Sequence, residues 1–260
     1  NLGGGGGTIG AAKVAKATPD GYTVLLHHIG MSTAPALYRR LSFDPLKDFE
    51  YIGLINEVPM TFVTKNDLPV KAIGELPAYV KAHADKVTLA NAGVGSASHL
   101  CGLLFMSQIG QSLTTVPYKG AAPAITDLIG GQVDMLCDQT TNTTQHIKAG
   151  KIRALAVTTD KRLSTLPDLP TMAESGFKGF NVSVWHALYA PKGTPKPVID
   201  KLVAALQEGL KNPELGKRFA ELGTEPVASD RATPEALHKF RAAEIDKWTP
   251  IIRKANIYAD

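Results

Sequence analysis

The sequence predicts an α/β protein folded into two lobes. Short runs of apolar and β-branched residues alternate with helical patterns along most of the 260 residues, most regularly between residues 71 and 180. After residue 180, one more strand pattern precedes two long helical patterns that have no sheet of their own to cover. Because strands that alternate with helices form βαβ units, we expect a central, mainly parallel sheet flanked by helices in each lobe.

The individual elements follow from the periodicity of apolar residues. The predicted strands are residues 22–26, 51–55 continuing through 60–63, 87–90, 114–116, 133–136, 153–157 and 182–189. The predicted helices are residues 75–83, 98–109, 122–129, 143–148, 197–211 and 233–255. Thr233 as N-cap and Pro234 in the first helical position mark the start of the last helix.

The order of these elements predicts an inserted lobe. The two C-terminal helices have only the N-terminal segment to pack against, so the chain must return to it after residue 183. We therefore expect lobe 1 to comprise residues 1–65 and 184–260, and lobe 2 to comprise residues 66–183. Two chain crossings, near residues 64–68 and 180–184, would form a hinge.

Composition excludes several classes of function. With Lys+Arg 28 against Asp+Glu 24, the net charge is +4, and the charges are dispersed. Nucleic-acid binding needs a clustered basic surface, which this chain lacks. No apolar run is long enough to span a bilayer, so membrane insertion is not expected. The sequence opens on Asn1-Leu2 and a glycine run, without a signal-peptide pattern.

The cysteines do not identify a compartment. Cys101 and Cys137 fit neither a metal-ligand spacing nor a Cys-x-x-Cys pattern. Either one disulfide or two buried free thiols fits this pair, and we favour the thiols.

The glycine run matches a dinucleotide-binding pattern only superficially. Residues 5–10 satisfy G-x-G-x-x-G and lead into a helical pattern. A dinucleotide fold needs a strand directly before those glycines, to aim the pyrophosphate at the helix N-terminus. No strand precedes them in this sequence, so we expect no nucleotide cofactor.

A second glycine-rich segment is better suited to binding an anion. Asn91, Gly93, Gly95 and Ser96 follow a predicted strand and lead into a helix, where backbone N–H groups converge. Ser96 adds a hydroxyl donor. The alternative is a plain turn with Ser96 as N-cap.

Two further loops repeat this arrangement. Residues 118–123 and residues 138–142 each follow a strand and precede a helix. In an open α/β sheet, ligands bind along the edge formed by the carboxyl ends of the strands. We therefore expect these three loops to form one ligand-binding edge.

Histidines permit two alternatives that we do not favour. His27 and His28 could suggest a metal site, but neighbouring residues of a strand point to opposite faces, and no ligand cluster accompanies them. Ser96 and His99, with Asp138 as the orienting acid, could suggest a hydrolase. That enzyme would need the hydroxyl of Ser96 within hydrogen-bond reach of the His99 ring.

A series of ordered motifs spans the chain: Pro19-Asp20-Gly21-Tyr22-Thr23, Tyr118-Lys119-Gly120, Gly131-Gln132-Val133-Asp134, Ala149-Gly150-Lys151, Leu166-Pro167 with Pro170-Thr171, Pro191 with Gly193-Thr194-Pro195, and Phe240 through Glu244 and Trp248 to Ala255. In these motifs and their order, the chain resembles the substrate-binding receptors of tripartite tricarboxylate transporters, also called Bug receptors.

The resemblance implies a type II periplasmic-binding-protein fold whose two lobes close on ligand like a Venus flytrap, from a cleft between them. It implies a receptor, not an enzyme, that works in the periplasm without metal or cofactor. We expect it to be monomeric and to deliver a small carboxylate to integral-membrane permease subunits. Family members also carry a first strand and a Pro-Gly-Gly loop before the position of Asn1, which would add further ligand contacts.

The family holds carboxylates mainly through loop amides, hydroxyls and ordered water. Carried over to this chain and combined with the glycine loop, this gives the candidate ligand residues His28, Met31, Ser32, Thr33, Asn91, Gly95, Ser96, Ala97, Gly120, Ala121, Asp138 and Trp185. Trp185 and Tyr118 could equally be core aromatics or cleft walls. His28, Met31 and Trp185 favour an aromatic acid such as terephthalate among the dicarboxylates that the family accepts.

Overall fold

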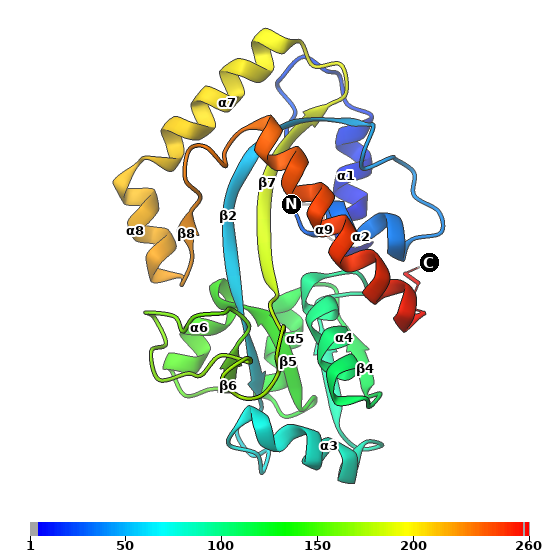
Figure 1. Ribbon diagram of the computed structural model, residues 1–260, viewed down its shortest axis with the longest axis vertical. Helices are drawn as coiled ribbons and strands as arrows, with labels where there is room; N and C mark the ends of the chain where they lie inside the picture. The colour runs from blue at the N-terminus through cyan, green and yellow to red at the C-terminus, as the bar shows by residue number, and fades with distance from the viewer. Residues whose placement is uncertain (1–4, 257, 260) are drawn as a thin grey trace. The chain divides into compact units, whose positions relative to one another are not determined.

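The computed structural model describes residues 5–256, 258 and 259. Residues 1–4, which include the first two glycines of the glycine run, lie outside the described part. The chain divides into two compact units: unit 1 comprises residues 1–57, 185–220 and 225–260, and unit 2 comprises residues 58–184 and 221–224 (Figure 1). The chain passes between them inside one long strand and at the start of another, and the hinge near 64–68 and 180–184 stays a prediction.

The sheet of unit 2 has the strand order β6-β2-β5-β3-β4. Its strands are β2 (Phe49–Thr64, of which the C-terminal half belongs here), β3 (Thr88–Asn91), β4 (Thr114–Pro117), β5 (Met135–Gln139) and β6 (Arg153–Val157). β3 runs parallel to β4 and β5, whereas β2 is antiparallel to β5 and β6.

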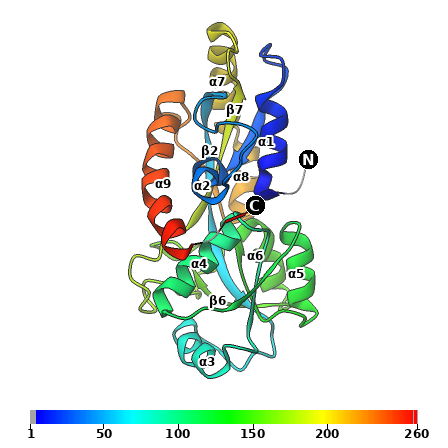
Figure 2. The same ribbon diagram turned by 90° about the vertical axis from the view of Figure 1, so that its right-hand side faces the viewer.

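Helices cover both faces of this sheet. They are α3 (Leu76–His83), α4 (Ala97–Ile109), α5 (Ala121–Ile129) and α6 (Thr140–Lys148). Figure 2 shows α4 on one side of the sheet and α5 on the other. The α5 side holds an aliphatic core around Leu136 and Leu128, while on the α4 side the ring centroids of Phe62 and Phe105 lie 4.7 Å apart. Burial of these side chains on both faces is the main force that stabilises the unit.

Unit 1 contains a second sheet. Its strands are β1 (Leu25–His28), β7 (Ser183–Pro191), the N-terminal half of β2, and β8 (Glu225–Pro226). Its helices are α1 (Thr8–Ala15), α2 (Gly30–Leu37), α7 (Lys196–Leu210), α8 (Pro213–Glu221) and α9 (Pro234–Ala255). As expected, the C-terminal helix α9 packs against an N-terminal element, α2. Thr233 accepts a hydrogen bond from the Ala236 amide as the predicted N-cap.

The α/β class is confirmed, but the sheets are mixed rather than mainly parallel. β1 is antiparallel to β7, and β2 is antiparallel to β8. A short βαβ crossover forces neighbouring strands to run parallel. The chain reaches the unit 1 part of β7 only after it has passed through the main segment of unit 2, residues 58–184, so no such crossover constrains the direction of β7.

The long strand β2 belongs to both sheets. It pairs with β8 up to Glu57 and with β5 from Met60 onward. Pro59 lies between these pairings, where its missing N–H removes no hydrogen bond from either. Gly53 allows a close approach, because a Cβ there would lie 2.7 Å from the backbone carbon of Ala232.

Most predicted elements lie within a few residues of those observed, but the first strand starts later than predicted, and the two-residue strand β8 and two helices were not predicted. The first strand begins at Leu25, and Tyr22 is 94% exposed instead of belonging to it. The helices α2 and α8 were not predicted. Pro35 inside α2 breaks the pattern by which helices are recognised. In the described part of the chain, no helix combines the length and apolar character that a membrane crossing requires.

Candidate functional site in the loops of unit 2

Three helices begin at one edge of the unit 2 sheet. β3, β4 and β5 are parallel neighbours, with Asn91 opposite Pro117 and Ala90 opposite Leu136, so their carboxyl ends lie together. The helices α4, α5 and α6 follow these ends within a few residues. The N–H groups of a helix's first turn have no partner within the helix, and the helix dipole makes this end favourable for an anion. The three predicted loops therefore share one edge of the unit 2 sheet, and its role in binding a ligand stays a prediction.

The glycine loop before α4 has a defined shape. The Asn91 side chain accepts a hydrogen bond from the Gly93 amide at 3.0 Å. Gly93 and Gly95 have φ values of +114° and +82°, which other residues rarely adopt. A Cβ on Gly93 would also lie 3.1 Å from the carbonyl oxygen of Tyr118.

Ser96 is the N-cap of α4. Its Oγ accepts a hydrogen bond from the His99 amide at 3.2 Å. The hydroxyl proton of Ser96 and the amides of Ala97 and Ser98 are therefore left to interact with an anion at the helix start. Both alternatives drawn from the sequence, cap and donor, are compatible in this geometry.

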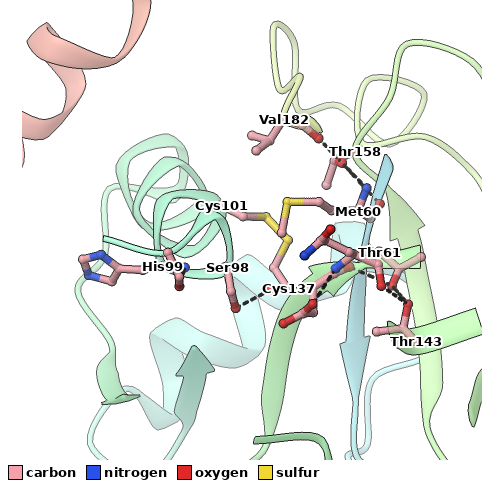
Figure 3. The surroundings of a disulfide bond; sticks show 12 residues. Met60, Thr61, Ser98, His99, Cys101, Cys137, Thr143, Thr158 and Val182 are labelled. Carbon is pink, nitrogen blue, oxygen red and sulfur yellow. Dashed lines mark hydrogen bonds between the residues drawn. A yellow bond between two sulfur atoms is a disulfide. The ribbon is translucent and has the colours of Figure 1, made fainter. Parts of the chain in front are cut away.

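Two links attach α4 to β5. The Ser98 hydroxyl donates to the Cys137 carbonyl at 2.6 Å, and Cys101 forms a disulfide with Cys137, with their Cα atoms 6.1 Å apart (Figure 3). The expectation of two free thiols is therefore wrong. Positions 98, 101 and 105 share the face of α4 that packs on the sheet, so Cys101 meets β5, a juxtaposition that chain spacing does not reveal.

The loop before α5 has open space around its glycine. Gly120, the N-cap, has φ +121°, and no atom would lie within 4 Å of a Cβ built there. Ala121 begins the helix and is half-buried. The Tyr118 hydroxyl donates to Asp127 on α5 at 2.7 Å, and burial, followed by Asp127, raises the pKa of Tyr118 to about 12. The hydrogen bond to Asp127 thus attaches Tyr118 to α5.

Asp138 is the penultimate residue of β5 and lies two residues before the start of α6. Its Oδ1 accepts hydrogen bonds from the Gln139 amide at 2.7 Å and from Asn142 Nδ2 at 2.8 Å. Its Oδ2 is buried and has no hydrogen-bond partner among the described residues. Burial raises the pKa of Asp138 to about 6, against the effect of both hydrogen bonds. An unpaired buried oxygen is costly, which makes this carboxyl group a candidate to meet a ligand or a water.

The candidate residues of unit 1 lie at the end of β1 and in α2. The His28 Nδ1 accepts a hydrogen bond from the Gly30 amide at 3.0 Å, and the ring is half-buried. Met31, Ser32 and Thr33 are fully buried, and the Thr33 hydroxyl has no partner among the described residues. The Ser32 hydroxyl donates to the Arg241 carbonyl at 3.5 Å.

Arg241 supports this segment, and nothing in the sequence singled it out. Pro35 has no N–H, so the carbonyl of Met31 one turn earlier lacks its helical partner. Arg241 Nη2 donates to that carbonyl at 2.9 Å, and Nη1 donates to the Pro45 carbonyl. The guanidinium is completely buried and also bonds Tyr51. It therefore replaces the backbone donor that Pro35 removes.

Trp185 is a core residue of unit 1. It is completely buried, its Nε1 donates to Glu244 at 3.0 Å, and its ring contacts Phe240 edge to face with centroids 5.5 Å apart. Of the two alternatives left open by the sequence, this geometry favours the core aromatic.

The histidines of unit 1 form a neutral cluster. The rings of His27 and His28 have centroids 4.5 Å apart, and His28 pairs with His186 across β1 and β7. Burial, above all, lowers the pKa of all three, that of His186 to about 4. No group of three His, Cys, Asp or Glu residues in the described chain is arranged to hold a metal ion.

The geometry needed for a Ser–His hydrolase is not present in the described chain. Ser96 Oγ accepts from the backbone amide of His99, not from its ring. The His99 Nδ1 accepts from the Gly95 amide at 3.2 Å, and burial lowers the pKa of this ring to about 4. Figure 3 shows the ring pointing away from Ser98 and the disulfide.

Comparisons with known proteins agree with this architecture. Residues 1–257 match the family model described as tripartite tricarboxylate transporter family receptor. Among solved structures, the chain is similar to the periplasmic binding protein BugD, with 54% identity over 98% of this chain and 85% of that one, at a TM-score of 0.94.

Two further similar structures contain ligands. Rpa4515 of R. palustris with adipate is 33% identical over 98% of this chain and 85% of that one, with a TM-score of 0.92. MatC from Rhodopseudomonas palustris with bound malate is 36% identical over 96% and 85%, with a TM-score of 0.91. The fold, the motifs and the family model agree, so the chain belongs to the tripartite tricarboxylate transporter receptor family and is a periplasmic solute-binding protein of the Bug type, a receptor and not an enzyme.

Proposed function

We propose that this receptor binds a small aliphatic dicarboxylate and delivers it to a tripartite tricarboxylate-type permease in the inner membrane. The observation that carries the proposal is the edge of unit 2 at which α4, α5 and α6 begin beside one another. One carboxylate would accept hydrogen bonds from the Ala97 amide and the Ser96 hydroxyl, with further donors from the start of α5.

The chemistry of this edge suits a carboxylate. Its donors are backbone amides and hydroxyls, which bind an anion by hydrogen bonds and helix dipoles without an arginine. Adipate and malate, the ligands in the two similar structures, are both dicarboxylates. These ligands belong to those proteins, and they support the ligand class proposed for this one.

The internal contacts of Trp185 favour an aliphatic ligand over an aromatic one. The inclination toward terephthalate depended on this ring lining the site, but the ring contacts Phe240 in an edge-to-face arrangement and its N–H donates to Glu244. Terephthalate is therefore the alternative that a binding experiment must include.

The experiment is a thermal-shift panel on the mature protein. We expect malate, adipate or another aliphatic dicarboxylate to raise the melting temperature, because a ligand at about 100 times its Kd stabilises the folded state by about 2.7 kcal/mol. Terephthalate, monocarboxylates and NAD are expected to produce smaller shifts. No shift with any carboxylate at millimolar concentration would overturn the proposal.

A pair of N-cap variants separates binding from stability. Ser96→Ala removes a donor to the ligand, which we expect to weaken affinity about 10-fold, since one hydrogen bond to a charged group contributes about 1.5 kcal/mol. Thr233→Ala is the matched control, because Thr233 caps α9 with the same 3.2 Å bond. It should lower stability by about 1 kcal/mol without changing affinity. Equal affinity in both variants would mean that Ser96 acts only as the N-cap of α4 and does not donate to the ligand.

Delivery to the permease is tested in cells. Deleting the receptor gene should abolish uptake of the labelled dicarboxylate identified in vitro, and restoring the gene should recover it. Undiminished uptake in the deletion strain would contradict the transport role while leaving the binding result intact.

A further inference from the structure

We propose that His99 is a positioning residue, whose neutral imidazole holds the glycine loop in the shape that presents the first amides of α4 to a carboxylate. This inference rests on the proposed function for its consequence in binding, but the arrangement itself is independent of any ligand.

Two hydrogen bonds between the loop and the first turn of α4 carry the proposal. The Ser96 hydroxyl accepts from the His99 amide at 3.2 Å, and the His99 Nδ1 accepts from the Gly95 amide at 3.2 Å. The chain on either side of the helix start is thereby joined by reciprocal side-chain-to-backbone bonds. The arrangement resembles a capping box, in which a residue in the first turn accepts from the backbone just before the helix. Here an imidazole replaces the usual carboxylate or amide.

The loop needs such a restraint because of its composition. Gly93 and Gly95 both have positive φ, and glycine loses more conformational freedom on ordering than any other residue. If the Gly95 amide had no acceptor, the loop could leave this conformation at little cost. The amide of Ala97, only two residues further on, would then lose its fixed direction.

The hydrogen-bond pattern also determines the protonation of the ring. An Nδ1 that accepts from an amide carries no proton, so the neutral ring has its proton on Nε2. The side chain is 5% exposed, and burial lowers the pKa of His99 to about 4, with no charged group contributing to the shift. Of the strands that pack on α4, β3 has no titratable side chain and β5 has only Asp138, whose Oδ1 bonds Gln139 and Asn142. The ring therefore remains an acceptor at neutral pH.

Three variants test the role in binding. His99→Phe keeps a ring of similar shape but has no acceptor, and we expect it to weaken dicarboxylate binding about 10-fold, the equivalent of about 1.4 kcal/mol. His99→Asn places an amide oxygen near the position of Nδ1 and should restore most of the affinity. His83→Phe is the matched control, because His83 lies in unit 2 on α3, where its Nδ1 bonds the Tyr79 carbonyl. It should bind like the wild type.

Two measurements without ligand separate this proposal from the proposed function. Nitrogen NMR of the ligand-free protein should show the Nε2–H form of His99, and hydrogen exchange of the Gly95 amide should be at least about 10-fold faster in His99→Phe. A proton on Nδ1, or unchanged Gly95 exchange, would refute the hydrogen-bond arrangement. Faster exchange with unchanged dicarboxylate affinity would overturn the positioning role. A wild type that binds no carboxylate would instead contradict the proposed function.

Discussion

The disulfide should stabilise one unit of the molecule much more than the other. Cys101 and Cys137 lie in unit 2, and both are completely buried. The bond closes a loop with a sequence separation of 36 residues. In the chain-entropy model, a loop of this length stabilises the folded state by about 4 kcal/mol, because it restricts the unfolded chain.

Fluorescence and circular dichroism can resolve this difference. The chain has 2 tryptophans, Trp185 and Trp248, and both belong to unit 1. Tryptophan fluorescence in urea therefore follows unit 1, whereas far-ultraviolet circular dichroism follows both units. With a urea dependence of about 2 kcal/mol per molar, loss of 4 kcal/mol moves a midpoint by about 2 M. We expect the reduced protein to show an early dichroism transition shifted by about this amount, while the fluorescence midpoint moves little.

The double variant Cys101→Ala/Cys137→Ala controls for the reductant. It should unfold at or below the midpoint of the reduced wild type, because it also lacks two buried sulfur atoms. Identical dichroism curves for oxidised and reduced protein would refute the chain-entropy argument. Equal shifts by both probes would refute the assignment of the effect to unit 2.

Two further predictions concern buried charges. Arg241→Met should destabilise unit 1 by about 3–5 kcal/mol, because the Met31 and Pro45 carbonyls lose the donor of their hydrogen bonds. Tryptophan fluorescence in urea measures this change, and a loss of stability below about 1 kcal/mol would contradict the role of Arg241. Asp138 has a folded pKa of about 6, above its ordinary 3.8, so its contribution to stability is complete below pH 3.8 and is lost as pH rises through about 6. His99, with a folded pKa of about 4 against 6.5, acts in the opposite sense, and its contribution is lost as pH falls from about 6.5 toward 4. Asp138→Asn should therefore stabilise unit 2 by up to about 3 kcal/mol near pH 7.5. Below about pH 6 the variant should lose stability more steeply than the wild type, because only the effect of His99 remains. Circular dichroism measures both changes, and an unchanged pH profile would exclude opposite contributions of Asp138 and His99.

Local sequence patterns were sufficient for much of the fold. Apolar periodicity located most strands and helices, because alternation and helical spacing depend only on near neighbours. The cap at Thr233 and the glycine loop before α4 were recognised from residue types with specific backbone roles. The helix α2 was missed because Pro35 lies inside it, and a proline inside a helix removes a backbone hydrogen bond. The side chain of Arg241, distant in the sequence, supplies the missing donor to the Met31 carbonyl.

For the candidate site, too, some features were predicted from local sequence patterns and others required the tertiary structure. The sequence by itself determined which loops follow the strands, and hence that Ser96, Gly120 and Asp138 belong to one edge. Its ordered motifs also determined the receptor family. Only the tertiary structure decided that Cys101 forms a disulfide with Cys137, that Trp185 is a core residue and that the ring of His99 accepts a hydrogen bond from the Gly95 amide. These outcomes depend on which face of a helix or strand meets a segment far away in the chain. That relation comes from packing across the whole unit, and no local pattern of residues encodes it.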